Sequence, residues 1–171
     1  MERRVVITGL GAITPIGKNV NETWESILNK KCGIDNISLF DSTNFKTKLD
    51  AEVKNYNPLD YFDLKQSKRL DRVSQFAIIA AREAVTSSGI TKENTDFNRV
   101  GIFVSSGIGG LRTIQEQCDV NFEKGNKRIS PMFIPMSIAN MPSGNIAIEF
   151  GFKGESMSIL TACSSSTHAI G

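Results

Sequence analysis

The stretch MSILTACSSS, residues 157–166, carries most of the information about the fold. Its apolar part, 157–162, predicts a buried strand, and three serines follow Cys163 directly. A strand that runs into a cysteine with small neighbours predicts a nucleophile elbow, a sharp strand-to-helix turn that exposes the nucleophile. We therefore expect the last helix of the chain to begin at Cys163.

A thiol at the start of a helix is well placed for nucleophilic chemistry. The unpaired N–H groups and the positive end of the helix dipole stabilise a thiolate. The same N–H groups can hold the oxyanion that forms when a thioester carbonyl is attacked. A buried structural cysteine at the end of a strand would leave the same local pattern, so these residues alone leave both interpretations open.

His168 is the only histidine in the sequence, and its position argues against a role as the base for Cys163. On one helix the two side chains would diverge, because five residues correspond to about 140° of rotation and about 7.5 Å of rise. We expect His168 to pack or to form a hydrogen bond. The general acid and base must then lie outside this chain.

The remaining sequence alternates between strand and helix patterns, which predicts an α/β fold with a layered sheet. Strands are expected at 3–8, 99–105 and 157–162. Helices are expected at 21–30 with Asn21 as cap, from a cap at Ser67 to Gly89, at 111–124, and at 134–150 in two pieces with Pro142 starting the second. Alanines recur in the 67–89 helix, so we expect it to pack closely against another element.

The chain is expected to be one domain, residues 1–171, cut shortly after the nucleophile helix begins. A buried helix of about two turns would leave its strand without cover. We therefore expect the N-terminal part of a longer protein.

Composition excludes several classes of function. The formal net charge is +2 in 171 residues, which gives no field for nucleic acid. No apolar run is long enough to span a membrane, so a cytoplasmic protein is expected. Cys32, Cys118 and Cys163 are far apart and only one histidine is present, so we expect neither a metal site nor a disulfide framework.

Two glycine-rich segments resemble phosphate-binding loops only superficially. Gly9 and Gly11 follow the first predicted strand, but Thr14 replaces the third glycine of a dinucleotide fingerprint. The segment Gly107–Gly110 has no Lys-Ser/Thr after it and is no P-loop. We expect its glycines to let the backbone approach a ligand or another chain. No cofactor is therefore expected.

Basic residues form two clusters, either of which is more simply a solvated surface. Together they could bind an acidic partner. The clusters are Lys65, Lys68, Arg69 and Arg72, and Lys124, Lys127 and Arg128.

Four segments together resemble the elongating β-ketoacyl-acyl-carrier-protein synthases of fatty acid synthesis, the second type most closely. They are RVVITGLG (4–11) with TPIG (14–17), SGIGG (106–110), KRISP (127–131) and TACS (161–164). Each is weak alone, but their order and spacing over the whole chain are specific.

The resemblance implies a thiolase-like layered fold, of which this chain is most of the N-terminal half. Cys163 would accept an acyl chain from acyl carrier protein, and its N–H would form half of the oxyanion hole. Decarboxylation of a malonyl carrier protein would then supply the attacking carbanion. Ile108 would lie at the acyl pocket, and Phe133 and Ile134 would reach in from the partner of a homodimer.

The resemblance also implies where the acidic carrier docks and what this chain lacks. The docking positions would be Lys65, Lys68, Arg69, Lys127 and Arg128. The two catalytic histidines, a lysine and the other half of the oxyanion hole would follow Gly171. The chain alone is therefore expected to be inactive in condensation.

Three other interpretations remain open. One is a thiolase or a chain-initiating synthase that uses coenzyme A. Another is a non-catalytic partner subunit or a folding and dimerisation fragment. The third is a nicotinamide oxidoreductase.

Overall fold

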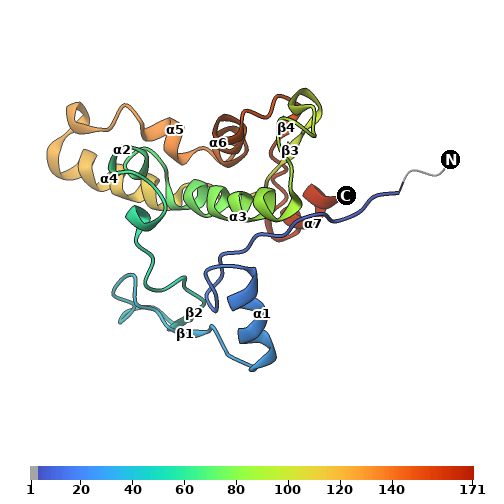
Figure 1. Ribbon diagram of the computed structural model, residues 1–171. Coiled ribbons are helices and arrows are strands. Elements are labelled where there is room, and N and C mark those ends of the chain that lie inside the picture. The colour runs from blue at the N-terminus through green and yellow to red at the C-terminus, as the bar shows by residue number, and fades with distance from the viewer. Residues whose placement is uncertain (1–3) are drawn as a thin grey trace. The chain divides into compact units, whose positions relative to one another are not determined.

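The computed structural model describes residues 4–171, which form two compact units (Figure 1). The first unit contains the described residues up to Asn57 together with Ile79–Gly89. The second contains Pro58–Ile78 and Ile90–Gly171.

The first unit has one complete helix, α1 (Val20–Leu28), and a small antiparallel sheet of β1 (Asp35–Asn36) and β2 (Leu49–Asp50). The cap of α1 is Asn19 rather than the predicted Asn21, and its side chain accepts a hydrogen bond from Glu22 N at 2.8 Å. Glu22 in turn accepts the N–H of Lys18 at 2.9 Å, so the two side chains satisfy donors reciprocally at the start of the helix.

The long helix α3 (Arg72–Ser88) contributes its later turns to the first unit. Its alanines pack closely, as the sequence predicts. A Cβ on Gly9 would lie 2.2 Å from the carbonyl oxygen of Ala84, and one on Gly11 would lie 1.8 Å from that of Ala80. The two glycines therefore let the N-terminal segment lie directly on the helix backbone.

Glu83 of α3 fixes this segment further. One carboxylate oxygen accepts the N–H of Ala12 and the other accepts the N–H of Val20, both at 2.9 Å. A single side chain thus ties the N-terminal segment and the first turn of α1 to α3.

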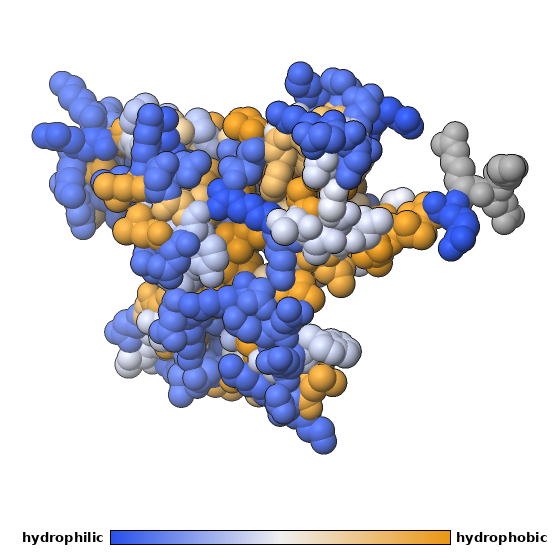
Figure 2. Space-filling view, viewed as in Figure 1, coloured by the Kyte–Doolittle hydropathy of each residue, from blue (hydrophilic) through white to orange (hydrophobic). Residues whose placement is uncertain are grey.

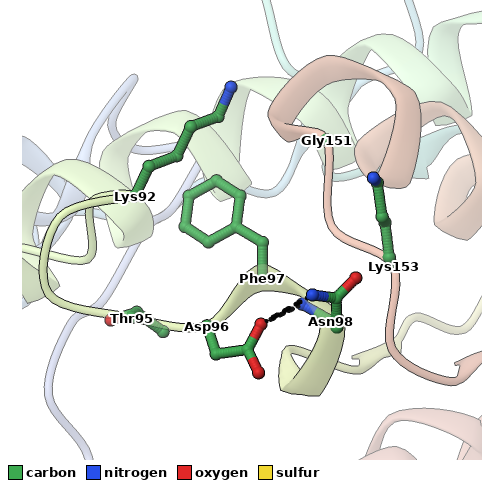
Figure 3. A pocket seen from close by; sticks show the side chains of 7 residues that line it. All are labelled: Lys92, Thr95, Asp96, Phe97, Asn98, Gly151 and Lys153. Carbon is green, nitrogen blue, oxygen red and sulfur yellow. Dashed lines mark hydrogen bonds between the residues drawn. The ribbon is translucent and has the colours of Figure 1, made fainter.

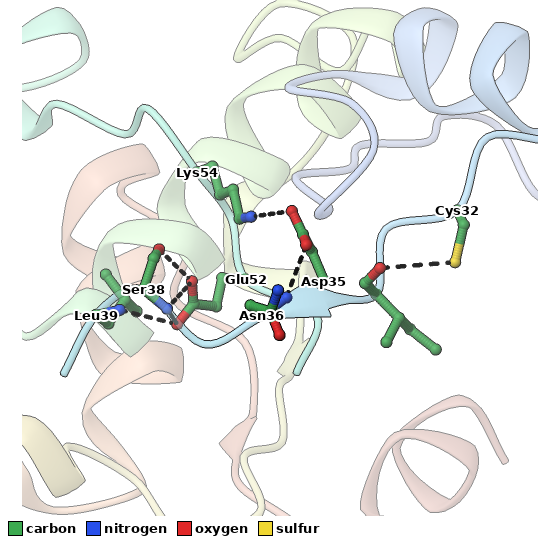
Figure 4. Close-up of polar contacts among 8 residues, drawn as sticks. Cys32, Asp35, Asn36, Ser38, Leu39, Glu52 and Lys54 are labelled. Carbon is green, nitrogen blue, oxygen red and sulfur yellow. Dashed lines mark hydrogen bonds and ion pairs between the residues drawn. The ribbon is translucent and has the colours of Figure 1, made fainter. Parts of the chain in front are cut away.

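A second carboxylate, Glu52, organises the loop after β1 (Figure 4). Glu52 is 5% exposed and accepts hydrogen bonds from the N–H groups of Ser38 and Leu39, at 3.1 Å each, and from the Ser38 hydroxyl at 2.6 Å. The Ser38 hydroxyl is the main cause that lowers the pKa of Glu52. Nearby, Lys54 pairs with Asp35 at 2.6 Å, and that hydrogen bond lowers the pKa of Asp35.

The Glu52 contacts predict how the stability of the chain depends on pH. Because its folded pKa is lowered, the stabilisation is fully present above the ordinary glutamate pKa of about 4.3 and is lost as pH falls through the folded value. Glu52→Gln should therefore flatten the loss of stability in this range. Urea unfolding between pH 6 and pH 3 checks this. Glu123→Gln, the same change at an exposed position of helix α4 (Leu111–Lys124), should give the same pH profile as the parent chain.

The second unit holds the other helices: α2 (Leu64–Ser67), the first turns of α3, α4 (Leu111–Lys124), α5 (Phe133–Ser137), α6 (Met141–Phe150) and α7 (Ser165–Ile170). Strands β3 (Ile102–Phe103) and β4 (Ser156–Met157) pair in parallel, with Ile102 opposite Ser156. Helix α6 lies against both strands (Figure 1). The core of the second unit includes three buried side chains, Ile146 of α6, Ile102 of β3 and Phe152.

None of the three predicted strands has its predicted extent. Residues 4–8 form no strand, while Arg3 lies outside the described residues. Val5 and Ile7 are 95% and 84% exposed, and this apolar segment is the orange stretch near the N-terminus in Figure 2. The prediction at 99–105 reduces to β3, and the prediction at 157–162 overlaps β4 only at Met157. A strand is defined by its partner's hydrogen bonds, and within the described chain only short segments have one.

The helix after Ser67 also differs from the prediction. Ser67 ends the short α2, which Asp63 caps by accepting the N–H of Gln66 at 2.7 Å. Helix α3 starts at Arg72, where Asp71 accepts the N–H of Val73 at 2.9 Å. The predicted end is confirmed, because Gly89 follows the helix with φ +70°.

The later helices follow the prediction closely. Helix α4 has the predicted bounds, and the predicted 134–150 helix is indeed in two pieces, α5 and α6. Pro142 lies in the first turn of α6, one residue after its start, and Gly151 ends it in the left-handed conformation. Within residues 4–171, no helix has the length and apolar character that a membrane span requires.

Candidate functional site

Cys163 lies in a tight turn between β4 and α7. The turn is a 3-10 helix, Ala162–Ser164, so the α-helix begins at Ser165 and not at Cys163 as predicted. Ala162 has φ +53°, a left-handed conformation that is unfavourable for a residue with a Cβ. Cys163 is exposed. The sharp turn and the exposed thiol agree with the predicted elbow.

Ser165 holds the strained turn in place. Its hydroxyl accepts the N–H of Thr161 at 2.8 Å and donates to the carbonyl of Ala162 at 2.7 Å. The Ser165 side chain is buried, and both hydrogen bonds are partly buried. The residues on either side of Cys163 are therefore fixed while the thiol stays accessible. From the sequence, Ser165 was recognised only as a small residue.

A second serine connects this turn to the end of β3. The Ser105 hydroxyl donates to the carbonyl of Ser165 at 3.0 Å, although the two residues are 60 positions apart. The glycine-rich segment after β3 is thereby anchored next to Cys163.

His168 has the role expected for it. Its Nδ1 lies 2.7 Å from the hydroxyl of Thr161, so the two side chains share a hydrogen bond. The contact braces α7 against the residue before Ala162.

The segment Gly107–Gly110 lies close to the backbone of this same chain. The sequence predicted that its neighbour would be a ligand or another chain. Gly110 N donates to Ser137 O at 2.9 Å. A Cβ on Gly110 would lie 2.6 Å from Met136 O, and one on Gly109, at φ +89°, would lie 2.8 Å from Ser137 O. Ile108, between Gly107 and Gly109, is 65% exposed.

Phe133 and Ile134 begin α5. Phe133 is half-buried, whereas Ile134 is 57% exposed. Helix α5 contacts both α4 and α6, so this pair is carried by packed elements of the second unit.

The five predicted docking cations are all exposed on the second unit. Lys65 lies in α2, Lys68 and Arg69 follow it, and Lys127 and Arg128 lie in a 3-10 turn, Asn126–Arg128, after α4. Arg69 lines a hollow of about 310 Å³ together with Met132 and Pro135. The structure therefore brings one of the docking cations beside the start of α5.

Two other hollows lie away from these residues in the sequence. One, of about 410 Å³, has Lys92 and Lys153 on either side of Phe97 (Figure 3). The other, of about 400 Å³ in the first unit, includes Cys32, whose thiol lies 3.9 Å from Ile34 O (Figure 4). Across residues 4–171, no cluster of His, Cys, Asp and Glu side chains could hold a metal ion.

Residues 2–171 match the family described as "Beta-ketoacyl synthase, N-terminal domain". The chain belongs to this family. The match covers all the segments that carry the resemblance in the sequence, including the turn at Cys163.

Curated relatives of this ketoacyl synthase chain are named 3-oxoacyl-[acyl-carrier-protein] synthase 2. The protein of Staphylococcus aureus (strain N315) is 41% identical over 169 residues, and that of Coxiella burnetii is 42% identical over 170. Each match covers 99% of this chain but 41% of the relative, so the chain spans about two fifths of their length.

Solved structures show the same ketosynthase fold. The ishigamide ketosynthase/chain length factor is 26% identical and superposes with a TM-score of 0.83, covering 94% of this chain and 40% of that one. A type II PKS ketosynthase bound to the hexaketide, in complex with its acyl-carrier protein, gives 0.82 at 24% identity and covers 99% of this chain and 45% of that one. The predicted thiolase-like α/β fold is confirmed.

Family membership also removes the nicotinamide interpretation. Gly9 and Gly11 had suggested a dinucleotide loop, but they pack against Ala84 and Ala80 of α3. Close packing on the helix backbone accounts for both glycines.

Proposed function

We propose that this chain supplies the acyl-accepting nucleophile of an elongating 3-oxoacyl-acyl-carrier-protein synthase. The Cys163 thiolate attacks the thioester carbonyl of an acyl carrier protein, the bond to the carrier sulfur breaks, and a new thioester forms on Cys163. The carrier sulfur leaves as a thiolate and takes up the proton that Cys163 released when it ionised, so the carrier is released as a thiol. The observation that carries the proposal is the exposed thiol in a turn whose flanking residues are fixed by Ser165.

In the full reaction, decarboxylation of a malonyl carrier protein generates a carbanion that attacks the Cys163 thioester. Fatty acid elongation is the pathway that the names of the 41% identical relatives support. The only histidine here, His168, is engaged with Thr161, so this chain provides the acyl-enzyme step and not the acid–base step. We propose that the intact enzyme is a cytoplasmic homodimer in which Phe133 and Ile134 face the partner's acyl pocket.

The elbow predicts which thiol reacts first. Cys32, Cys118 and Cys163 are all exposed, so exposure alone does not distinguish them. We expect iodoacetamide to label Cys163 first, because the neighbouring backbone is fixed by Ser165 and the thiol lies just before the start of α7. Peptide mass spectrometry at partial labelling measures the order. Faster labelling of Cys32 or Cys118 in the folded chain would remove the main support for this function.

Docking of the acidic carrier should depend on the basic residues as a group. Arg69→Ala alone should cost little, since an exposed pair contributes at most about 1 kcal/mol. The double reversal Lys68→Glu/Arg69→Glu should slow acylation of Cys163 from a carrier-borne donor at least about tenfold at low salt, because like charges then repel. Acylation from a small-molecule thioester should keep its rate.

The matched control is Lys92→Glu/Lys153→Glu, the same change in charge at the hollow of Figure 3. The control variant should be acylated at the parent rate by both the carrier-borne and the small-molecule donor. An equal loss with both donors in the Lys68/Arg69 variant, or no loss with either, would show that these cations do not dock the carrier.

A further inference from the structure

Asp71 is a buried carboxylate that the proposed reaction does not use. It is 5% exposed and lies just before α3. One oxygen accepts the N–H of Val73 at 2.9 Å. The other accepts the hydroxyl of Thr113 at 2.5 Å and the N–H of Thr113 at 3.2 Å. A single side chain therefore joins the first turns of α3 and α4, which are about 40 residues apart in the chain.

The Asp71–Thr113 contact also closes one end of the segment that carries Ile108. Gly110 directly precedes α4, and a Cβ there would lie 3.0 Å from the carboxyl carbon of Asp71. At the other end of the segment, Ser105 is bonded to the carbonyl of Ser165 beside Cys163. Ile108 is thus exposed in a loop whose two ends are fixed by buried or half-buried hydrogen bonds.

Helix capping alone does not account for this arrangement. Asp63 and Asp96 each accept an N–H within their own turn and are exposed. Asp71 instead directs one oxygen to a second helix and packs against the backbone of Gly110, so no side chain larger than hydrogen fits there. Because buried polar groups must be satisfied, breaking the Thr113 contact will shift α4 and the loop that leads into it.

We propose that Asp71 is a positioning residue that, through Thr113, holds the Ile108 loop in place and thereby limits the length of the chain that reaches Cys163. The inference rests on the proposed function and on the place at the acyl pocket that the family resemblance implies for Ile108. Loosening the contact lets the loop move, so long apolar chains gain access while short ones, which do not extend to Ile108, are unaffected.

The test compares alkylation of Cys163 by N-methylmaleimide and N-octylmaleimide, with Cys32 and Cys118 replaced by serine. Thr113→Val removes the hydroxyl and keeps the shape of the side chain, whereas Thr113→Ser keeps the hydroxyl. The ratio of octyl to methyl rates should rise about fivefold in Thr113→Val, the size expected for one lost hydrogen bond. It should return to the parent value in Thr113→Ser, and Asp96→Asn should leave it unchanged.

A ratio that does not change in Thr113→Val, or equal changes with both probes, overturns the proposal. If Thr113→Val does not fold, as judged by circular dichroism, Asp71→Asn carries the same comparison. The Asn oxygen still accepts from Val73 N, whereas the NH2 group is a donor and cannot accept the N–H of Thr113. Alkylation needs no acyl transfer. Failure of the parent chain to accept an acyl group from a carrier thioester would therefore refute the proposed function while the alkylation ratio still decides the role of Asp71.

Discussion

Replacing Cys163 with serine should reduce acylation of this chain by an acyl carrier thioester by a factor on the order of 10⁴ or more. A thiol is partly ionised near neutral pH and is intrinsically nucleophilic, whereas a hydroxyl requires an adjacent base. The only histidine, His168, is hydrogen-bonded to Thr161 and cannot activate a hydroxyl introduced at this position.

Mass spectrometry of the intact chain after incubation with acyl carrier thioester measures this effect. Cys32→Ser and Cys118→Ser are the matched controls, since both thiols are also exposed, and they should acylate at the parent rate. With malonyl carrier protein added, the chain alone should release no sustained ketoacyl product. Acylation that persists in Cys163→Ser would place the nucleophile elsewhere.

The position of Cys163 could be predicted from the sequence because the signal is local. An apolar run ends at a cysteine and serines follow, an order that is typical of a tight strand-to-helix turn. The means by which the turn is held could not be predicted. The Ser165 hydroxyl bonds back to Thr161 and Ala162, the two residues before Cys163, yet the sequence shows only one serine among three.

Helices were easier to predict than strands for a related reason. The residue directly after helix α4 marks where the helix ends, because Gly125 adopts φ +79° there. The start of α1 was misplaced by two residues because Asn19 and Asn21 both suit a cap. Strand length instead depends on partners far along the chain, and the apolar residues at 4–8 do not reveal whether one is within reach.

Contacts between distant segments could not be predicted from the sequence. Asp71 and Thr113 lie 42 positions apart, and nothing in either segment marks them as a pair. The glycines at 107–110 were recognised as a point of close approach, but the neighbour proved to be the chain's own residues 136–139. The glycines thus indicated that another group must come close to this backbone, while only the fold shows which group it is.

Gly11→Ala should destabilise the chain by at least about 3 kcal/mol, because the added methyl group cannot be accommodated. Its carbon would lie 1.8 Å from the carbonyl oxygen of Ala80, 2.7 Å from its carbonyl carbon and 2.9 Å from Ala84 N. These are backbone atoms of a regular helix, so neither a rotamer change nor a small side-chain shift relieves the overlap. The N-terminal segment must instead separate from α3, which also strains the hydrogen bond between Ala12 and Glu83.

Gly144→Ala is the matched control for this substitution. Gly144 lies within α6, and a Cβ there would meet nothing within 4 Å outside its own helix backbone. Alanine should therefore stabilise the chain by about 0.5–1 kcal/mol, since a helix interior favours it over glycine. Urea unfolding of both variants, followed by circular dichroism, should give opposite signs. Parent-like stability of Gly11→Ala would show that the N-terminal segment does not lie on α3 in solution.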